Sequence, residues 1–423
     1  MRRKGSCGGL TKEMQVFLKL FGEALKTEKS RNMTLTGMDS QSWKKVADLS
    51  ALHHVLPMIW NQINGQPLMS ELGEQLCRAW RMKAVSEILM QERRTSVFLH
   101  VYKKFWAQGL RPVVVKGMIL REIFPQPDYR SSSDEDIWID STCLPAYEDI
   151  LEQEGYIRKL LAEDVAVYVH QDTGFHLEVH LGGFQIGDDG LLLQKIFEGY
   201  ESRCIDVNVS GVTVRTLGHT DHMIYLISHD LKHFCGSGLG IRQIADTGLY
   251  AQSYGDQIDW QHIFGWSVEN GIYKFIQVLM KAAGQLGIQS LYATVFLDTQ
   301  EDRNPVIYEF IRDCLEGGIY GKSSMDRIYG GTMLRERLKN PDMSKGGAMW
   351  RRIFVPTEYA QVHYPFVKER PYLLPIAWVI RFIKYICRMR KNRMSLLLPV
   401  KTGSKRFELA SRMEIERFRE VRR

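Results

Sequence analysis

Two aspartates, Asp134 and Asp136, have the spacing of metal ligands on one face of a strand. Successive strand residues point to opposite faces, so these two carboxylates point the same way, about two residue rises apart. Carboxylates held that close repel each other unless a cation lies between them, and a hard divalent ion such as Mg²⁺ accepts such oxygen ligands. The apolar run 137–139 completes the strand. A surface turn rich in serine and aspartate has the same composition, so the neighbouring segments decide between the two interpretations.

A Lys-Gly turn precedes this strand and has the position of a phosphate-binding turn. Lys116 and Gly117 end the short apolar run 113–115 and lead into a helical pattern over 118–124. Backbone N–H groups at a helix N-terminus, together with the helix dipole, favour a bound phosphate. A plain turn with a solvated lysine is the alternative.

A third carboxylate lies on the clearest strand pair of the sequence. Residues 165–169 and 175–181 flank a turn signal, and the second strand alternates strictly between apolar and polar residues. Glu178 and His180 share its polar face. Three carboxylates and a phosphate-binding turn are what two-metal phosphoryl transfer needs, because the metals hold the attacking and leaving oxygens. A glutamate kept for solubility and a half-exposed strand histidine are the alternatives.

The order of these features resembles that of an uncharacterised bacterial nucleotidyltransferase-like family of the DNA polymerase β superfamily. The residues that match are Lys116-Gly117, Tyr129-Arg130, Asp134-x-Asp136 and Glu178-Val-His180. The resemblance extends over roughly residues 40–390 and includes the helical segments at 43–59 and around 229–246. It implies an α/β (α+β) nucleotidyltransferase fold, in which a small mixed sheet with flanking helices holds the carboxylates.

The resemblance also implies an activity, the transfer of a nucleoside monophosphate from a nucleoside triphosphate to an acceptor hydroxyl with release of pyrophosphate. Asp134 and Asp136 would bind Mg²⁺ or Mn²⁺, and Glu178 would hold the catalytic metal and help to activate the acceptor. The acceptor stays open among a small molecule, a protein and a tRNA end. The sequence does not select ATP, GTP, CTP or UTP either.

The chain departs from the superfamily pattern at the turn. Nucleotide contacts would come from Lys116, Gly117 and Arg130, but Met118 follows the glycine where the superfamily has serine. The turn is also separated from Asp134 by 17 steps, more than is usual. Either Lys116 supplies the missing triphosphate contact, or the site is degenerate. In the second case the fold serves as a nucleotide-sensing or partner-binding module without catalysis.

Other polar residues each allow two interpretations. Arg130 can clamp a phosphate or pair with Asp128, and Arg242 and Asp246 can contact substrate or form an ion pair on a helix surface. A metal site like that of phosphohydrolases is a separate interpretation of a segment rich in histidine and aspartate: His219, His222, His229, Asp230, His233 and Asp246.

Patterns along the chain predict four regions. Residues 1–95 form an N-terminal helical region, and 96–215 alternate strands and helices as the catalytic domain. Residues 216–300 form a helical substrate-binding region, and 301–423 a mixed C-terminal region. The chain has 423 residues, 44% hydrophobic and 25% charged, which is typical of a globular protein with two or three domains. No transmembrane segment is expected, and the scattered odd number of cysteines favours the reducing cytoplasm.

The positive charge is concentrated in the tail. The net charge is +7, but from residue 378 onward 14 Lys and Arg face 4 Glu, which leaves the rest near −3. A helical pattern over 376–390 has Arg381 and Lys384 on one face and Ile376 and Ile383 opposite. Such a helix can lie on an anionic membrane, bind RNA, or dock on the protein with its charged side to water.

Overall fold

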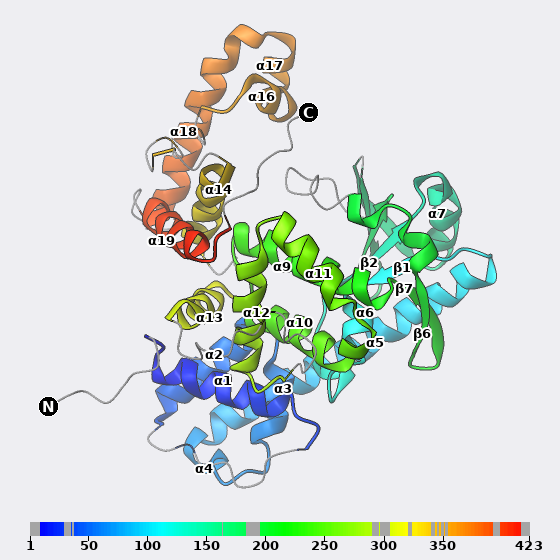
Figure 1. Ribbon diagram of the computed structural model, residues 1–423, viewed down its shortest axis with the longest axis vertical. Coiled ribbons are helices and arrows are strands. Elements are labelled where there is room, and N and C mark those ends of the chain that lie inside the picture. Colours follow the sequence, from blue (N-terminus) through cyan, green and yellow to red (C-terminus); the bar gives the residue numbers. More distant parts are fainter. Residues whose placement is uncertain are drawn as a thin grey trace, which may run out of the picture.

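The described residues contain one mixed sheet of seven strands in the order β3-β4-β5-β2-β1-β7-β6. The sheet lies on the right of Figure 1. The computed structural model describes residues 9–28, 35, 38–162, 164–182, 195–289, 296, 305–319, 324–339, 343–344, 347, 351, 354–391 and 398–415. The strands are β1 (Val113–Val115), β2 (Asp134–Ile139), β3 (Tyr156–Leu161), β4 (Val165–His170), β5 (His176–Leu181), β6 (Ile205–Val209) and β7 (Val212–Thr216).

Strand pairing explains how distant segments meet at the centre of the sheet. Strand β2 pairs in parallel with β5 on one side and antiparallel with β1 on the other. The outer pairs β3–β4, β4–β5 and β6–β7 are antiparallel, and β1 is parallel to β7. The mixed sheet with flanking helices confirms the predicted α/β class. The expected strands at 165–169 and 175–181 are β4 and β5.

Helices cover both faces of this sheet. Helices α5 (Glu74–Ala107) and α7 (Leu144–Gln153) pack on one face, where strand residues such as Ile137 and Leu177 are fully buried. Helix α9 (His219–Cys235) lies against the other face, and Trp138 of β2 packs edge-on against its Tyr225, with ring centroids 5.4 Å apart. Because strand residues alternate, Asp136 lies on the same face as Trp138, beneath α9.

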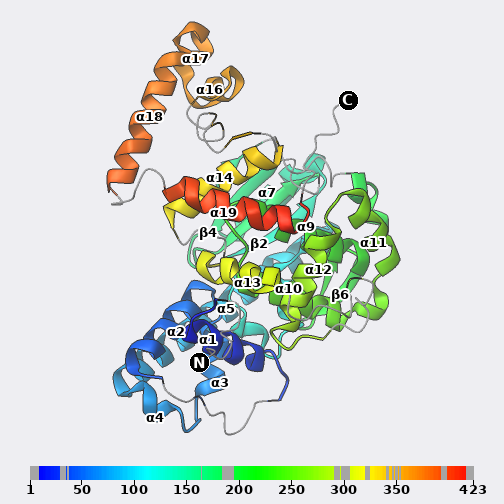
Figure 2. The same cartoon turned by 60° about the vertical axis from the view of Figure 1, so that its left-hand side comes forward.

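The other helices form regions on either side of the sheet domain (Figures 1 and 2). Helix α5 runs unbroken through residue 95, so a single helix joins the N-terminal helices to the sheet. The N-terminal helices are α1 (Lys12–Ala24), α2 (Ser40–Leu52), α3 (Leu56–Ile63) and α4 (Met69–Leu72), and α6 (Gly117–Arg121) follows β1. After α9 come α10 (Ile241–Ser253), α11 (Trp260–Glu269), α12 (Tyr273–Gly284), α13 (Pro305–Gly317), α14 (Met325–Lys339), α16 (Thr357–His363), α17 (Pro365–Glu369), α18 (Leu374–Lys391) and α19 (Leu398–Arg412).

None of the described helices is both long and apolar enough to cross a membrane. The last part of the basic tail, 416–423, lies outside the described residues.

A buried histidine joins the N-terminal helices to α13 and predicts a pH effect on stability. His53 is fully buried, and its Nε2 lies 3.2 Å from the carbonyl oxygen of Leu315. Burial lowers the pKa of His53 from 6.5 to about 4, so only the unfolded chain takes up this proton between those values. The free energy of unfolding should therefore fall by about 2 kcal/mol from this residue as the pH drops from 7 to 5. Urea denaturation of wild type and His53→Gln at both pH values measures this difference. An equal change in the free energy of unfolding between pH 7 and pH 5 in the two proteins would contradict it.

Candidate metal and nucleotide site

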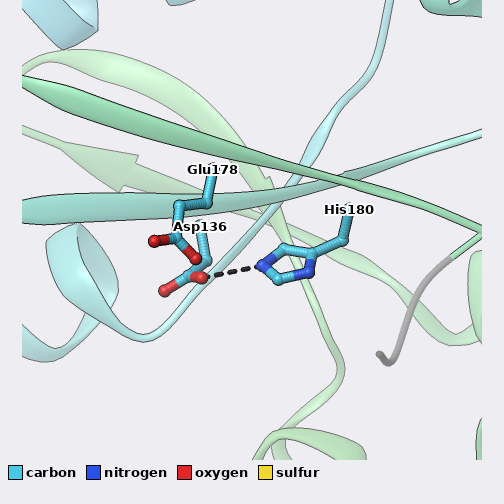
Figure 3. Close-up of side chains that lie close together, drawn as sticks. All are labelled: Asp136, Glu178 and His180. Carbon is cyan, nitrogen blue, oxygen red and sulfur yellow. Dashed lines mark hydrogen bonds and ion pairs between the residues drawn. The ribbon is translucent and has the colours of Figure 1, made fainter. Parts of the chain in front are cut away.

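Neighbouring parallel strands bring the predicted carboxylates together. In the β2–β5 register Asp136 is the partner of Glu178, and Trp138 is the partner of His180. One ligand atom from each of Asp136, Glu178 and His180 lies within 4.8 Å of the other two. Figure 3 shows the three side chains lying close together. Two carboxylates and an imidazole from adjacent strands can therefore hold a divalent cation.

Asp136 is the centre of this group because both of its carboxylate oxygens are engaged. The ammonium Nζ of Lys116 lies 2.8 Å from Oδ2, and Nε2 of His180 donates to Oδ1 at 2.8 Å. Burial raises the pKa of Asp136, but the nearby Lys116 charge and the His180 hydrogen bond outweigh it, so the net pKa lies below the ordinary value. Burial acts to lower the pKa of Lys116, but the negative charge of Asp136 outweighs it, so the net pKa lies well above the ordinary value. The two groups are a charged pair in this state.

Glu178 differs from Asp136 in having no bonded partner. Within the described residues its carboxylate makes no hydrogen bond or ion pair. Burial, followed by repulsion from Asp136 and Asp134, raises its pKa. A carboxylate with these properties is ready to bind a cation or to accept a proton.

Asp134 lies at the start of β2 and lines the same cavity, but it is outside the compact group of three. Its Oδ1 accepts a hydrogen bond from the Ser133 hydroxyl at 3.1 Å. All three predicted carboxylates line the same cavity, but the compact group consists of Asp136, Glu178 and His180. The role of Asp134 as a metal ligand stays a prediction.

The Lys-Gly turn lines the cavity with its lysine, while its backbone is engaged elsewhere. Lys116 has a φ of 58° and Gly117 a φ of 22°, so the chain turns sharply from β1 into α6. The N–H of Met118 donates to Oε2 of Glu135 at 2.7 Å, and the side chain of Met118 is buried. That N–H is therefore not directed at a ligand in this state. Lys116 and Gly117 both line the cavity, and the phosphate contact predicted for them stays a prediction.

Helix α9 adds histidines to the wall opposite the carboxylates. His229 Nε2 lies 3.1 Å from Lys116 Nζ and 3.0 Å from His233 Nε2. Burial and the Lys116 charge hold the pKa of His229 well below 6.5. The N–H of Lys116 donates to Nε2 of His222 at 3.3 Å. Among the described residues these histidines form no group of three ligands around a metal position, so the structure does not favour the phosphohydrolase-like interpretation.

Two of the alternatives for the polar residues are wrong. The sequence suggests Asp128 as the partner of Arg130, but Nε and Nη2 of Arg130 donate to the two carboxylate oxygens of Asp246, at 2.7 and 2.8 Å. Asp246 and Arg242 are buried, so they are no ion pair on a helix surface. Arg242 donates through Nη1 to the carbonyl oxygen of Ser131. These contacts join α10 to the loop before β2. They could not be predicted from the sequence, because they join residues more than 100 positions apart.

Most of the charged groups described above line one cavity of about 290 Å³. Its cationic side chains are Lys116, Arg130, Lys232 and Arg242, and its acidic ones are Asp134, Asp136, Glu178, Asp230 and Asp246. The predicted site residues Gly117 and His180 line it as well. Carboxylates on the two strands, with lysine and arginine side chains beside them, fit a polyanion that is bound together with a metal ion.

Comparison with known proteins agrees with this arrangement. The sequence model of a family described as "Uncharacterised nucleotidyltransferase" matches residues 39–286, which include β1, β2, β5, α9 and α10. No curated protein and no solved structure matches the chain. Since the matched segment is more than half of the 423 residues, the chain belongs to this uncharacterised nucleotidyltransferase family.

Proposed function

We propose that the protein transfers a nucleoside monophosphate from a nucleoside triphosphate to an acceptor hydroxyl and releases pyrophosphate. The observation that carries this proposal is the register of β2 and β5, which sets Asp136 beside Glu178 in a cavity that is also lined by Lys116, Arg130, Lys232 and Arg242. Membership of the nucleotidyltransferase family supports the reaction class.

The donor set fits a divalent cation. Asp136, Glu178 and His180 offer two carboxylates and one imidazole, and Asp134 lies on the same strand face. Carboxylates suit Mg²⁺ and Mn²⁺, and the imidazole shifts the preference toward Mn²⁺. When bound, such an ion supplies positive charge to the phosphate and lowers the pKa of the attacking hydroxyl.

The chain's own residues have separable tasks in this proposal. The ammonium group of Lys116 is paired with Asp136 in this state, and it can bind a triphosphate oxygen instead when the nucleotide enters. Arg130 is fixed by Asp246 and by the carbonyl oxygen of Gly117, so it orients the turn that carries the lysine. Glu178, with its raised pKa, can accept the proton of the acceptor hydroxyl. Arg242, on α10, would contact the substrate from the side facing β2.

A non-catalytic nucleotide-binding module is the second candidate, and two observations favour it. The Met118 N–H, which a phosphate-binding turn would offer to its ligand, donates to Glu135 instead. The Lys116 ammonium is held between Asp136 and His229, in the place where a bound cation would compete with it. A module of this kind would bind the nucleotide and leave its phosphate bonds intact.

Labelled nucleotides distinguish the two candidates. The full-length protein is incubated with each nucleoside triphosphate, labelled at the α- or the γ-phosphate, in the presence of Mg²⁺ or Mn²⁺ and fractions of small molecules, tRNA and protein. Nucleotidyl transfer should move only the α-label to an acceptor, release pyrophosphate, and stop when EDTA is added. Binding of nucleotide without release of pyrophosphate would favour the sensor. Transfer of the γ-label would show a phosphotransferase and contradict both.

A further inference from the structure

Helix α18 carries an apolar stripe on its outer side. The helix extends away from the sheet domain together with α16 and α17, and both views show this (Figures 1 and 2). Large apolar side chains at helical spacing are 46–57% exposed, and a tyrosine just before the helix is 73% exposed: Ile376, Val379, Phe382, Ile383 and Tyr372. Residues 376, 379 and 383 follow the i, i+3, i+7 pattern of a single face. We call these five residues the apolar stripe.

The opposite side of α18 faces the protein. Ala377 and Tyr385 are buried there, and the indole N–H of Trp378 donates to the carbonyl oxygen of Val355 at 3.0 Å. Arg381 and Lys384 lie over the rings of Tyr359 and Tyr364, at 5.1 and 5.7 Å from the ring centroids, although Lys384 is still exposed to solvent. A docked helix that turns only its charged side to water is therefore wrong for this chain. The apolar side is the one that faces outward.

The sequence around the stripe is rich in positive charge. From residue 370 to 407 the sequence has ten Lys and Arg and no Asp or Glu. Arg370 before the helix and Arg390 near its end are exposed, so cations lie at both ends of the stripe. An exposed apolar face with basic surroundings is the pattern of helices that lie flat in the headgroup region of an anionic bilayer.

We infer that the apolar stripe binds the surface of a membrane that contains anionic phospholipid, with α18 parallel to the bilayer plane. The aliphatic side chains would enter the boundary between headgroups and acyl chains, and the lysines and arginines would reach the phosphates through their flexible stems. A second copy of the chain fits less well, because like charges would meet across the interface. RNA fits less well too, since aliphatic side chains gain nothing from a phosphate backbone.

Sedimentation of the full-length protein with lipid vesicles tests the inference. Vesicles of phosphatidylcholine alone are compared with vesicles that also contain phosphatidylglycerol. The anionic lipid should raise the bound fraction about tenfold or more, and added salt should reduce it. Ile383→Glu should weaken binding about tenfold. Leu89→Glu is the matched control, because Leu89 is 59% exposed on α5, far from the stripe, and its substitution should leave binding unchanged.

Each other outcome overturns the inference. Equal binding to both kinds of vesicle, or equal loss in Ile383→Glu and Leu89→Glu, would exclude the stripe as an anionic-membrane surface. If the wild-type protein does not bind vesicles but forms a dimer, and Ile383→Glu dissociates this dimer, the stripe is a contact between two copies. If Ile383→Glu instead releases bound RNA and leaves vesicle binding intact, the partner is RNA. Circular dichroism of both variants confirms that they remain folded.

Discussion

Glu178→Gln should reduce nucleotidyl transfer by about 10³-fold while the protein stays folded and becomes no less stable. The amide keeps the size of the side chain and removes its negative charge, so it binds a divalent cation poorly and accepts no proton. The carboxylate of Glu178 makes no hydrogen bond or ion pair within the described residues, and burial together with repulsion from Asp136 and Asp134 outweighs the attraction of His180 and Lys116, so its pKa is raised. Loss of its charge therefore relieves repulsion in the folded state, and the melting temperature should stay equal or rise.

Two companion variants make this expectation specific. Asp136→Asn should also lose transfer, but it removes the charged partner of Lys116 and should lower the free energy of unfolding by about 3 kcal/mol or more. Glu152→Gln makes the same chemical change on the exposed side of α7 and should alter neither property. Transfer rates and melting temperatures of the three proteins are measured side by side. Wild-type transfer by Glu178→Gln would refute the role of this carboxylate.

Local patterns were enough to predict the strands that carry the site, but not which strands are neighbours. Alternation in 175–181 and the apolar run after Asp136 placed both carboxylates on strands, and β5 and β2 confirm this. Their parallel pairing depends on the whole sheet order, which no local pattern contains. The β6–β7 hairpin did have a local signal, because Ser210-Gly211 separates two alternating runs and both residues take positive φ. Strand β3 had none, since its side chains are mostly exposed at the sheet edge.

The candidate site shows the same division between local and distant information. Lys116 and Glu178 stood out by residue type and local context, and both line the cavity. The sequence offered Asp128 as the partner of Arg130 because it is close in the chain, whereas the true partner, Asp246, is 116 residues away. His180 on the polar strand face can be read from the sequence as a substrate or metal contact or as a half-exposed histidine; it is buried, and it binds Asp136, which is 44 residues away in the chain. Ion pairs inside a cavity depend on packing, so sequence proximity is a poor guide to them.

Gly117→Ala should lower the free energy of unfolding by about 3 kcal/mol or more and abolish nucleotide binding. A Cβ at this position would lie 1.9 Å from Oε2 of Glu135, far inside van der Waals contact, and the φ of 22° already disfavours a side chain. Glu135 cannot withdraw easily. It is fully buried, its Oε1 accepts from Nη2 of Arg121 at 2.6 Å, and its Oε2 accepts from the N–H of Met118. Moving it would leave a buried guanidinium without its charged partner.

This close contact gives a physical reason for the glycine and for the methionine that follows it. The Glu135 carboxylate takes the space beside the Gly117 Cα and the N–H of Met118, so the turn is held by the protein itself and keeps Lys116 above Asp136. Glu135→Asp shortens the side chain by one methylene, and when combined with Gly117→Ala it should restore part of the lost stability. Gly265→Ala is the control, because a Cβ there meets no atom within 4 Å and should stabilise helix α11 by up to about 1 kcal/mol. Urea denaturation of wild type, Gly117→Ala, the double variant and Gly265→Ala measures these changes in the free energy of unfolding. If Gly117→Ala unfolds at the same urea concentration as wild type, the Glu135 carboxylate is not packed against the turn, and some other contact must fix the position of Lys116.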